Sequence, residues 1–393
     1  MRIGIMGGTF DPIHNGHIKC AEEVQNALNL DKVLFIPTGE PPHKIARRVA
    51  SAEDRLEMVR LAICGYANFD VSDIEIRRNK YTYTYDTLVE LNNSFNDCEF
   101  YMIIGADTLA DIVNWHRAED VFKLCKFIAM KRPGADYDMF QSYLKKATDS
   151  GAEVLPVEIN EIDISSTLVR EKFKNGEDIS DLVPLKVSKY IEEKGIYSTK
   201  EMSYDEISAD MKKFLSPQRY EHCLNVAEEC VRLGKIYGAD ESKCRLAGIL
   251  HDVGKELTDK QYRWLGVNLS NDDFNGEKVL RHAFAGKIIA EGRYGISDCD
   301  ILEAIESHIT GKPNMGLLAK LIFIADYTEK GRVGKQFDEV RAKANDGKLD
   351  EAILLQCDNT LIYNLMRGSV HICTQTVKTR NWALSNITKN GEV

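Results

Sequence analysis

The periodicity of the apolar residues changes once along this chain of 393 residues, and that change constrains the fold more than any other feature. Over residues 1–197, short runs rich in β-branched residues alternate with segments of helical period, which is typical of βαβ units with a parallel sheet. We therefore expect an α/β domain that binds its ligands at the carboxyl ends of the strands. The expected strands include Arg2–Met6, Lys32–Ile36, Glu99–Ile104 and Lys126–Met130.

From Ser203 onward, the apolar residues recur every three or four positions and convincing strand patterns disappear. This pattern predicts an all-α bundle over residues 203–393, with the domain boundary within a few residues of Ile196–Lys200. Two of its helices are clear from their apolar faces. One should carry Cys223, Val226, Ala227, Cys230, Leu233 and Tyr237, and the other should carry Leu246, Ile249, Leu250 and Val253 and end at Gly254.

Charge and apolar content exclude several classes of function. Asp and Glu outnumber Lys and Arg by 61 to 51, so the bulk charge argues against nucleic acid as a partner. Phosphate ligands would be bound by local backbone amides, a few placed cations or metals. No run of about 18 apolar residues could span a membrane, and the N-terminus has no signal-peptide pattern, which predicts a cytoplasmic protein without a membrane partner. The 10 cysteines form no C-x-x-C pair and are expected to be reduced thiols.

A glycine-rich segment with two histidines follows the first expected strand and opens the first helix. It reads Gly7-Gly8-Thr9-Phe10-Asp11-Pro12-Ile13-His14-Asn15-Gly16-His17. The glycines allow close backbone approach, and the helix N-terminus offers free N–H groups to a phosphate. The segment matches neither the P-loop nor the dinucleotide fingerprint. Instead, His14 and His17 lie one helical turn apart with Gly16 leaving room between them, so their imidazoles could hold a triphosphate and stabilise charge as its α-phosphorus is attacked.

This segment resembles the signature of the H-x-G-H nucleotidyltransferase superfamily, which has a Rossmann-like fold. The usual second half of that signature, I-S-S-T-x-x-R, is present as residues 164–170. In that family both segments bind ATP around the transferred adenylyl group, and the two histidines are catalytic. Ser165 would cap a helix whose first amides meet phosphate, and Arg170 would reach the same anion. The resemblance therefore implies that ATP is bound by Gly7, Gly8, Thr9, Phe10, Ile164, Ser165, Ser166, Thr167 and Arg170.

Three further segments are similar to the nicotinate-nucleotide adenylyltransferases within that superfamily. They are residues 41–44 (P-P-H-K), residues 83–88 (Y-T-Y-D-T-L), and residues 105–108 (G-A-D-T) with the following Trp115-His116. The resemblance implies that Lys44 helps hold the phosphates and that Asp107 lies beside the ATP ribose or phosphates. It also implies that Thr84 and Trp115 hold nicotinate mononucleotide. In the implied reaction, ATP with Mg2+ transfers its adenylyl group to this mononucleotide, and pyrophosphate is released from ATP. The alternative is another adenylyltransferase, such as one acting on phosphopantetheine, and we interpret His116 as structural.

Six histidines and aspartates of the second half fall on or beside apolar helical faces. Side chains at such edges point toward the interior of a bundle, where several imidazoles and carboxylates would be costly unless they are neutralised. A divalent or trivalent transition metal neutralises them, so the pattern predicts a metal site. The predicted ligands are His222, His251, Asp252, His282, His308 and Asp326.

The order of these residues resembles the HD-domain phosphohydrolases from about Ser203 to Leu384. Residues 250–255, 307–311 and 324–332 are closer still to one branch, the symmetrical diadenosine tetraphosphate hydrolases. That branch cleaves the tetraphosphate into two ADP with a metal centre generally read as iron, with Mn2+ and Co2+ as alternatives. By position, its core metal ligands match His222, His251, Asp252 and Asp326, and those of a second metal match His282 and His308. Asp252 could bridge both ions.

The same resemblance implies metal-assisted hydrolysis, in which a water is acidified and phosphoryl oxygens are polarised. Asp252 and Lys255 would be catalytic, and Lys255 and Arg332 would bind phosphate. The chain departs from the family at Ala283, where Gly is common, and at Ile309, where Thr is common. The alternatives are hydrolysis of another nucleotide polyphosphate, such as a guanosine alarmone, and a non-catalytic module that binds a nucleotide and regulates the first domain. A homo-oligomer is compatible with this sequence.

Overall fold

The computed structural model describes residues 1–39, 45–78, 82–95, 97–131, 136–160, 163–197, 202–267, 280–368 and 372–389. The chain divides into two compact units, one of Met1–Pro42 with Val49–Lys200 and one of His43–Arg48 with Glu201–Val393. Among the residues expected to bind substrate, Lys44 lies outside the described residues. None of the described helices is both long and apolar enough to cross a bilayer.

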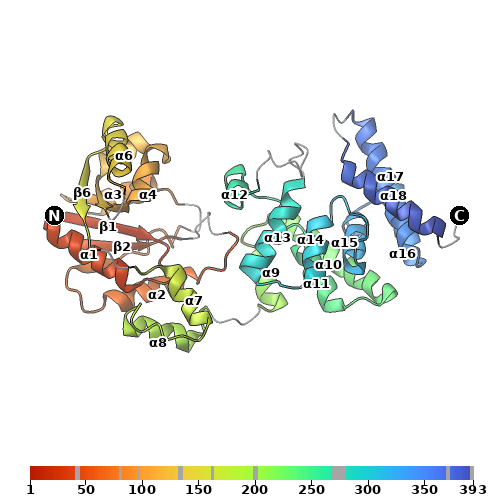
Figure 1. Ribbon diagram of the computed structural model, residues 1–393, viewed down its shortest axis with the longest axis horizontal. Helices are drawn as coiled ribbons and strands as arrows, with labels where there is room; N and C mark the ends of the chain where they lie inside the picture. Colours follow the sequence, from red (N-terminus) through yellow and green to blue (C-terminus); the bar gives the residue numbers. More distant parts are fainter. Residues whose placement is uncertain are drawn as a thin grey trace. The chain divides into compact units, whose positions relative to one another are not determined.

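Six parallel strands form the sheet of the N-terminal unit, in the order β3-β2-β1-β4-β5-β6. Figure 1 shows two neighbouring strands of this sheet, β1 and β2. The parallel α/β fold expected from the sequence is thereby confirmed. The four expected strands are present as β1 (Arg2–Gly8), β2 (Lys32–Pro37), β4 (Glu99–Gly105) and β5 (Lys126–Lys131). The two edge strands, β3 (Phe69–Val71) and β6 (Val154–Glu158), were not among them. β3 has only 3 residues and β6 contains a proline, so neither has a clear strand pattern.

Helices cover both faces of this sheet. One face carries α1 (Asn15–Leu28), α2 (Ala52–Ile63), α7 (Ser166–Lys174) and α8 (Leu185–Lys194), which share a core with Val33 and Phe35 of β2. The other face carries α3 (Thr84–Ser94), α4 (Ala106–Asp111), the short helix η2 (Ile112–Asn114), α5 (Ala118–Leu124) and α6 (Tyr137–Asp149), with Leu34 and Ile36 of β2. Alternate residues of β2 therefore enter opposite cores, as a strand buried on both faces requires.

Among its described residues, the C-terminal unit contains helices and no strand, which confirms the predicted all-α region. Ser203 caps the first helix of residues 203–393 in a capping box with Glu206, and Ser216 caps the second ahead of Pro217. The helices are α9 (Tyr204–Met211), α10 (Pro217–Tyr237), α11 (Glu241–Leu250), α12 (Asp259–Trp264), α13 (Arg281–Tyr294), α14 (Cys299–Ser307), α15 (Leu317–Thr328), α16 (Lys335–Asn345), α17 (Leu349–Met366) and α18 (Thr374–Lys389).

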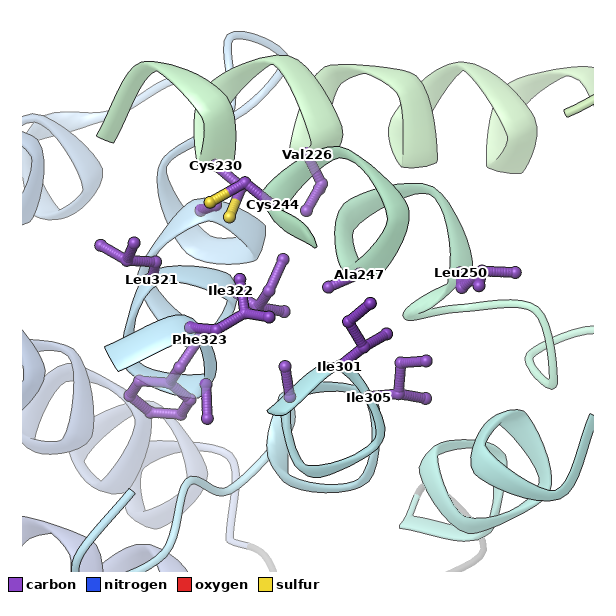
Figure 2. Close-up of a cluster of buried hydrophobic side chains, with 14 of the residues drawn as sticks. Val226, Cys230, Cys244, Ala247, Leu250, Ile301, Ile305, Leu321, Ile322 and Phe323 are labelled. Atoms are coloured by element: carbon purple, nitrogen blue, oxygen red, sulfur yellow. The ribbon is translucent and has the colours of Figure 1, made fainter. Parts of the chain in front are cut away.

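The core of the C-terminal unit lies between α10, α11, α14 and α15. Figure 2 shows Val226 and Cys230 of α10 facing Ala247 of α11, Ile305 of α14 and Ile322 of α15, all of them buried. Four of the six apolar residues assigned to the face of α10 are fully buried there: Cys223, Val226, Cys230 and Leu233. The packing of these apolar residues fixes the positions of the four helices. The polar residues described below lie on these helices or close to their ends.

The second helix expected in this half is shorter than predicted. α11 ends at Leu250 rather than at Gly254, and residues 251–256 form turns. The physical reason is the packing of this turn on α13, because a Cβ at position 254 would lie 2.5 Å from the carbonyl oxygen of His282. Glycine allows that close approach, and the chain leaves the helical path to make it. His251 and Asp252 consequently sit in a turn at the end of α11.

Candidate functional site

The two histidines of the glycine-rich segment stack on each other at the start of α1. His14 is the residue before the helix and His17 is in its first turn; the backbone N–H of His14 donates to Nδ1 of His17 at 3.3 Å. Their ring centroids are 3.7 Å apart. A Cβ at Gly16 would lie 3.0 Å from Nδ1 of His14, so the glycine does leave room for the ring, as the spacing predicted. The pair follows β1, at the carboxyl end of a central strand.

The two halves of the predicted ATP signature lie against each other. Arg170 donates to the carbonyl oxygen of Asp11 at 2.6 Å, and Ser166 donates to the carbonyl oxygen of Pro12 at 2.9 Å. Ser165 caps α7 by accepting from the backbone N–H of Leu168 at 3.1 Å, which confirms the predicted cap. The guanidinium of Arg170 therefore holds the glycine-rich loop in this structure, and its contact with a phosphate stays a prediction.

Asp11 is the centre of a buried network that the sequence did not identify. Its side chain accepts from the backbone N–H of Ala50 at 3.0 Å and from the hydroxyl of Tyr197 at 2.8 Å. Phe10 is buried beside it and contacts the ring of His17 edge-on, with centroids 5.2 Å apart. The side chain of Phe10 thus supports His17 from the core, while Gly7, Gly8 and Thr9 are at least partly exposed.

The residues expected to hold the pyridine mononucleotide and the ribose lie at helix starts. Thr84 opens α3, and Asp107 lies exposed in the first turn of α4, directly after β4. Trp115 is half-buried and contacts Phe127 with ring centroids 6.1 Å apart. Tyr83 and His116 form a ring pair with centroids 4.4 Å apart. His116, interpreted as structural from the sequence, therefore has an aromatic partner directly beside Thr84.

A half-buried acid supports the start of α3. Glu75 accepts hydrogen bonds from the hydroxyls of Thr87 at 2.9 Å and Thr82 at 3.2 Å, and these residues flank Thr84 in the chain. Burial raises the pKa of Glu75 above its ordinary value, although both hydrogen bonds act in the opposite direction. Sequence patterns gave no signal for this residue, since its partners are recognisable only in the fold.

The six predicted metal ligands converge in the C-terminal unit. They come from α10 (His222), the turn after α11 (His251 and Asp252), α13 (His282), the end of α14 (His308) and α15 (Asp326). Their ligand atoms fall into three overlapping groups, within each of which all atoms lie within 4.8 Å of one another. The groups are His222, His251 and Asp252; His251, His308 and Asp326; and Asp252, His282 and His308.

Asp252 lies between two sets of histidines. Its Oδ2 is 3.9 Å from Nε2 of His222 and 3.7 Å from Nε2 of His251. Its Oδ1 is 2.9 Å from Nε2 of His282 and 3.4 Å from Nε2 of His308. The two oxygens of one carboxylate thus face different imidazole pairs, as a bridging ligand of two ions would.

The protonation of His251, His282 and Asp252 suits metal ligands. Burial lowers the pKa of His251 to about 4, and burial likewise lowers the pKa of His282 to about 4, so both imidazoles are neutral near pH 7. Burial would raise the pKa of Asp252, but His251 and His282 hold it well below its usual range. Neutral imidazole and ionised carboxylate are the forms that bind a transition metal. Within the described part of the chain, the buried Nε2 of His251 has no hydrogen-bond partner, which leaves it to a ligand outside the protein.

Among the described residues, three cations contact the cluster, and the sequence identified two of them. Lys255 has its Nζ 3.0 Å from Nε2 of His282, and Arg332 has Nη2 3.3 Å from Oδ1 of Asp326. Arg219, the third, donates from Nη1 to Oδ2 of Asp252 at 2.7 Å. Arg219 stands three residues before His222 on α10, so the R-x-x-H spacing could have indicated it.

A buried carboxylate outside the predicted ligand set touches the cluster. Glu329 is 4% exposed, and its Oε1 lies 3.3 Å from Nδ1 of His222. It follows Asp326 by three residues at the end of α15, so the D-x-x-E spacing was the available signal.

Comparisons with known proteins divide the chain in the same way. The pattern of the family described as "Cytidylyltransferase-like" matches residues 5–172, and that of the "HD domain" matches residues 219–331. A solved structure from Clostridium acetobutylicum, described as a "predicted HD superfamily hydrolase involved in NAD metabolism", is 38% identical; the match covers 48% of this chain and 100% of that one with a TM-score of 0.45. Plasmodium falciparum nicotinic acid mononucleotide adenylyltransferase complexed with NaAD is 22% identical, with 50% and 97% covered and a TM-score of 0.42.

Curated relatives match the N-terminal half at higher identity. A "Probable nicotinate-nucleotide adenylyltransferase" of Desulfitobacterium hafniense is 45% identical over 200 residues, which are 50% of this chain and 95% of the relative. One of Geobacillus thermodenitrificans is 44% identical over 199 residues, which are 51% of this chain and 87% of the relative. Through this half, the chain belongs to the nicotinate-nucleotide adenylyltransferase family, and its helical half matches the HD domain.

Proposed function

We propose that this protein is a bifunctional enzyme whose N-terminal unit adenylylates nicotinate mononucleotide with ATP in NAD biosynthesis. The observation that carries the proposal is the stacked pair of His14 and His17 at the start of α1, beside the residue 164–170 segment. Phosphate in front of this helix would meet the positive end of the helix dipole and two imidazole donors. Family membership supports the same reaction.

In the proposed reaction, the phosphate of nicotinate mononucleotide attacks the α-phosphorus of ATP and pyrophosphate leaves. His14 and His17 donate hydrogen bonds to the phosphates and stabilise the charge that builds during the attack. Thr84 and Trp115 orient the mononucleotide, with the Trp115 indole available to stack on the pyridine ring. Asp107 lies beside the ribose or phosphates of ATP, and Mg2+ supplies further neutralisation of the triphosphate when bound.

The transferase proposal is tested with the purified full chain, ATP and Mg2+. Nicotinate mononucleotide, its amide analogue and phosphopantetheine are offered separately, and products are separated by liquid chromatography. We expect nicotinate adenine dinucleotide and pyrophosphate from the first substrate, and a loss of at least 100-fold in turnover in His17→Ala. Asn26→Ala, an exposed change on the same helix, is the matched control. Turnover of phosphopantetheine alone would favour the rival adenylyltransferase.

For the C-terminal unit, we infer a metal-dependent phosphohydrolase that cleaves diadenosine tetraphosphate symmetrically to two ADP. The supporting observation is Asp252, whose two oxygens face separate imidazole pairs. His222, His251 and Asp326 would hold one ion, and His282 with His308 would hold the other. A bound iron, Mn2+ or Co2+ pair supplies Lewis acidity for the attack of water on phosphorus. Metal identity and count are part of the proposal.

Cations of this chain surround the place where a polyphosphate would lie. Lys255, Arg219 and Arg332 each contact a residue of the proposed ligand set. Once the carboxylates are neutralised by metal, these cations are available to hold phosphoryl oxygens and to balance charge on the leaving ADP. Three cations around one site favour a polyphosphate over a single phosphate group.

The hydrolase proposal is tested on the full chain after anaerobic purification. Bound metal is quantified, and products from diadenosine tetraphosphate are identified in wild type and in His251→Ala. His116→Ala, in the other unit, is a histidine control for hydrolysis. ADP as sole product, bound transition metal and loss of turnover in His251→Ala would support the proposal. Turnover of guanosine polyphosphates instead would favour a different substrate, and a metal-free protein without turnover would favour a nucleotide-binding regulatory module.

A further inference from the structure

The imidazole of His222 is held between two carboxylates at the end of one helix. Its Nε2 lies 3.0 Å from Oδ1 of Asp326, and its Nδ1 lies 3.3 Å from Oε1 of Glu329. Asp326 is in the last turn of α15 and Glu329 is the residue that ends it, so the two side chains are one helical turn apart. Asp326 belongs to the proposed ligand set, whereas Glu329 reaches the opposite edge of the imidazole ring.

Two of the other histidines of the cluster are oriented by backbone carbonyls. Nδ1 of His251 lies 2.8 Å from the oxygen of Gly248, and Nδ1 of His308 lies 2.7 Å from the oxygen of Ile305. In both residues this contact fixes a hydrogen on Nδ1 and leaves Nε2 as the donor atom toward the cluster. Glu329 makes the corresponding contact to His222 with a carboxylate, which also makes the imidazole a stronger donor.

The carboxylate of Glu329 has a place built for it. Its Oε2 accepts from the backbone N–H of Gly331 at 2.5 Å, and the side chain is buried against α10. A Cβ at position 331 would lie 2.8 Å from Oε1 and 3.0 Å from Oε2 of this carboxylate. Glycine at 331 therefore leaves the space that Glu329 needs to reach His222.

We propose that Glu329 is the positioning residue of the His222 side of the metal centre. It accepts the Nδ1 hydrogen of His222, keeps Nε2 free of hydrogen and aimed at Asp326 and Asp252, and so sets the affinity of this side for a divalent transition metal. This inference rests on the proposed metal centre. Groups in this outer position typically change metal affinity by 10- to 100-fold when they are removed.

The test titrates metal-free full chain with Co2+ under anaerobic conditions, in competition with a chromophoric chelator. Wild type is compared with Glu329→Gln and with Glu228→Gln, an exposed acid on α10 that pairs with Lys330. We expect Glu329→Gln to weaken one class of Co2+ site by 10- to 100-fold and to change its visible spectrum, while the other class stays within about threefold. Glu228→Gln should titrate like wild type.

Gly331→Ala provides a second variant that keeps the carboxylate and displaces it. The atoms that its Cβ would meet are the ends of the flexible Glu329 side chain, so the fold should tolerate the change, as circular dichroism would verify. We expect it to weaken the same class of Co2+ site as Glu329→Gln. If both variants titrate like wild type, the inference is wrong and the metal centre stands. If wild type itself binds no Co2+, the metal centre and the inference both fail.

Discussion

Tyr197 donates a hydrogen bond to Oδ1 of Asp11 at 2.8 Å, although the two residues are 186 positions apart. Asp11 lies buried in the segment that carries His14 and His17. Burial, and then the charge of Asp11, raise the pKa of Tyr197 well above its ordinary value, so the phenol keeps its hydrogen at neutral pH. The end of the N-terminal unit therefore holds the loop at its beginning.

Tyr197→Phe should lower the free energy of unfolding of the N-terminal unit by about 1.5–3 kcal/mol, because a buried carboxylate loses a donor. Tyr190→Phe is the matched control, since its hydroxyl donates to Asp54 at 2.9 Å in a less buried setting. There we expect a loss of about 0.5–1 kcal/mol. Urea denaturation at pH 7 measures both. Equal losses of unfolding free energy in the two variants would show that the hydrogen bond to Asp11 stabilises the unit no more than the hydrogen bond to Asp54.

Gly16→Ala should separate stability from transfer activity. The new Cβ would lie 3.0 Å from Nδ1 of His14 and force the stacked rings apart, although alanine suits the helix itself. We expect turnover of ATP and nicotinate mononucleotide to fall by about 100-fold, as misplacement of a positioned group does. Thermal melting should remain near that of wild type. Asn26→Ala controls for added helix propensity, and wild-type turnover in Gly16→Ala would contradict a catalytic role for the pair.

Because of Glu75, the free energy of unfolding of the N-terminal unit should decrease as the pH rises above about 4.5. Burial raises its pKa above the ordinary 4.5, so the folded state binds this proton more tightly than the unfolded chain. The stabilisation is complete below about pH 4.5 and is lost as the pH rises through the folded pKa. In Glu75→Gln this loss should be absent, and urea denaturation across pH 4–8 would measure the difference. A variant with the same pH dependence as wild type would rule the assignment out.

Glu177 should change the free energy of unfolding with pH in the opposite direction to Glu75, and the same urea denaturation experiment measures it. Lys172 first, and Asn175 next, lower the pKa of Glu177, so its contribution is present above the unfolded pKa and is lost as the pH falls. Glu177→Gln should therefore reduce the acid-side loss of stability and leave the behaviour attributed to Glu75 intact.

Arg219→Gln should weaken binding of the tetraphosphate more than it slows hydrolysis. Arg219 contacts Oδ2 of Asp252 at 2.7 Å, and in the proposed enzyme it holds a phosphoryl oxygen of the substrate. Loss of one charged hydrogen bond to the substrate, about 1.5–3 kcal/mol, corresponds to a KM about 10- to 100-fold higher. Arg232→Gln, on the same helix and paired with Glu229, is the control. Steady-state kinetics over a range of salt concentrations would test this. An unchanged KM with lower kcat would instead assign Arg219 to positioning Asp252.

Local signals were read correctly from the sequence. The cap at Ser165, the space at Gly16 and the central strands each depend on residues close together in the chain, so their patterns are visible without the fold. The convergence of the six predicted ligands could also be predicted from the sequence, because each lies beside an apolar helical face.

Features that depend on packing between distant segments were missed. α11 was predicted to run to Gly254, but contact with α13 ends its helical path earlier. Glu75 and Tyr197 act through partners that the chain brings to them only on folding. Arg219 lies one helical turn from His222, and Glu329 lies one helical turn from Asp326. Such spacings are common on solvated helix faces, so the spacing alone did not identify either residue as part of the site.

The convergence of His222 through Asp326 has a consequence for the order of events during synthesis. The cluster takes residues from α10, the turn after α11, α13, α14 and α15, so it is incomplete until all of these have left the ribosome. The last strand of the N-terminal sheet ends at Glu158, so all of its strands are synthesised far earlier, and domains made first generally fold first. If the cluster binds metal as proposed, metal loading of the second unit would be a late step of biogenesis, and a cell short of metal would accumulate chains whose first half is mature and whose second half awaits its ion.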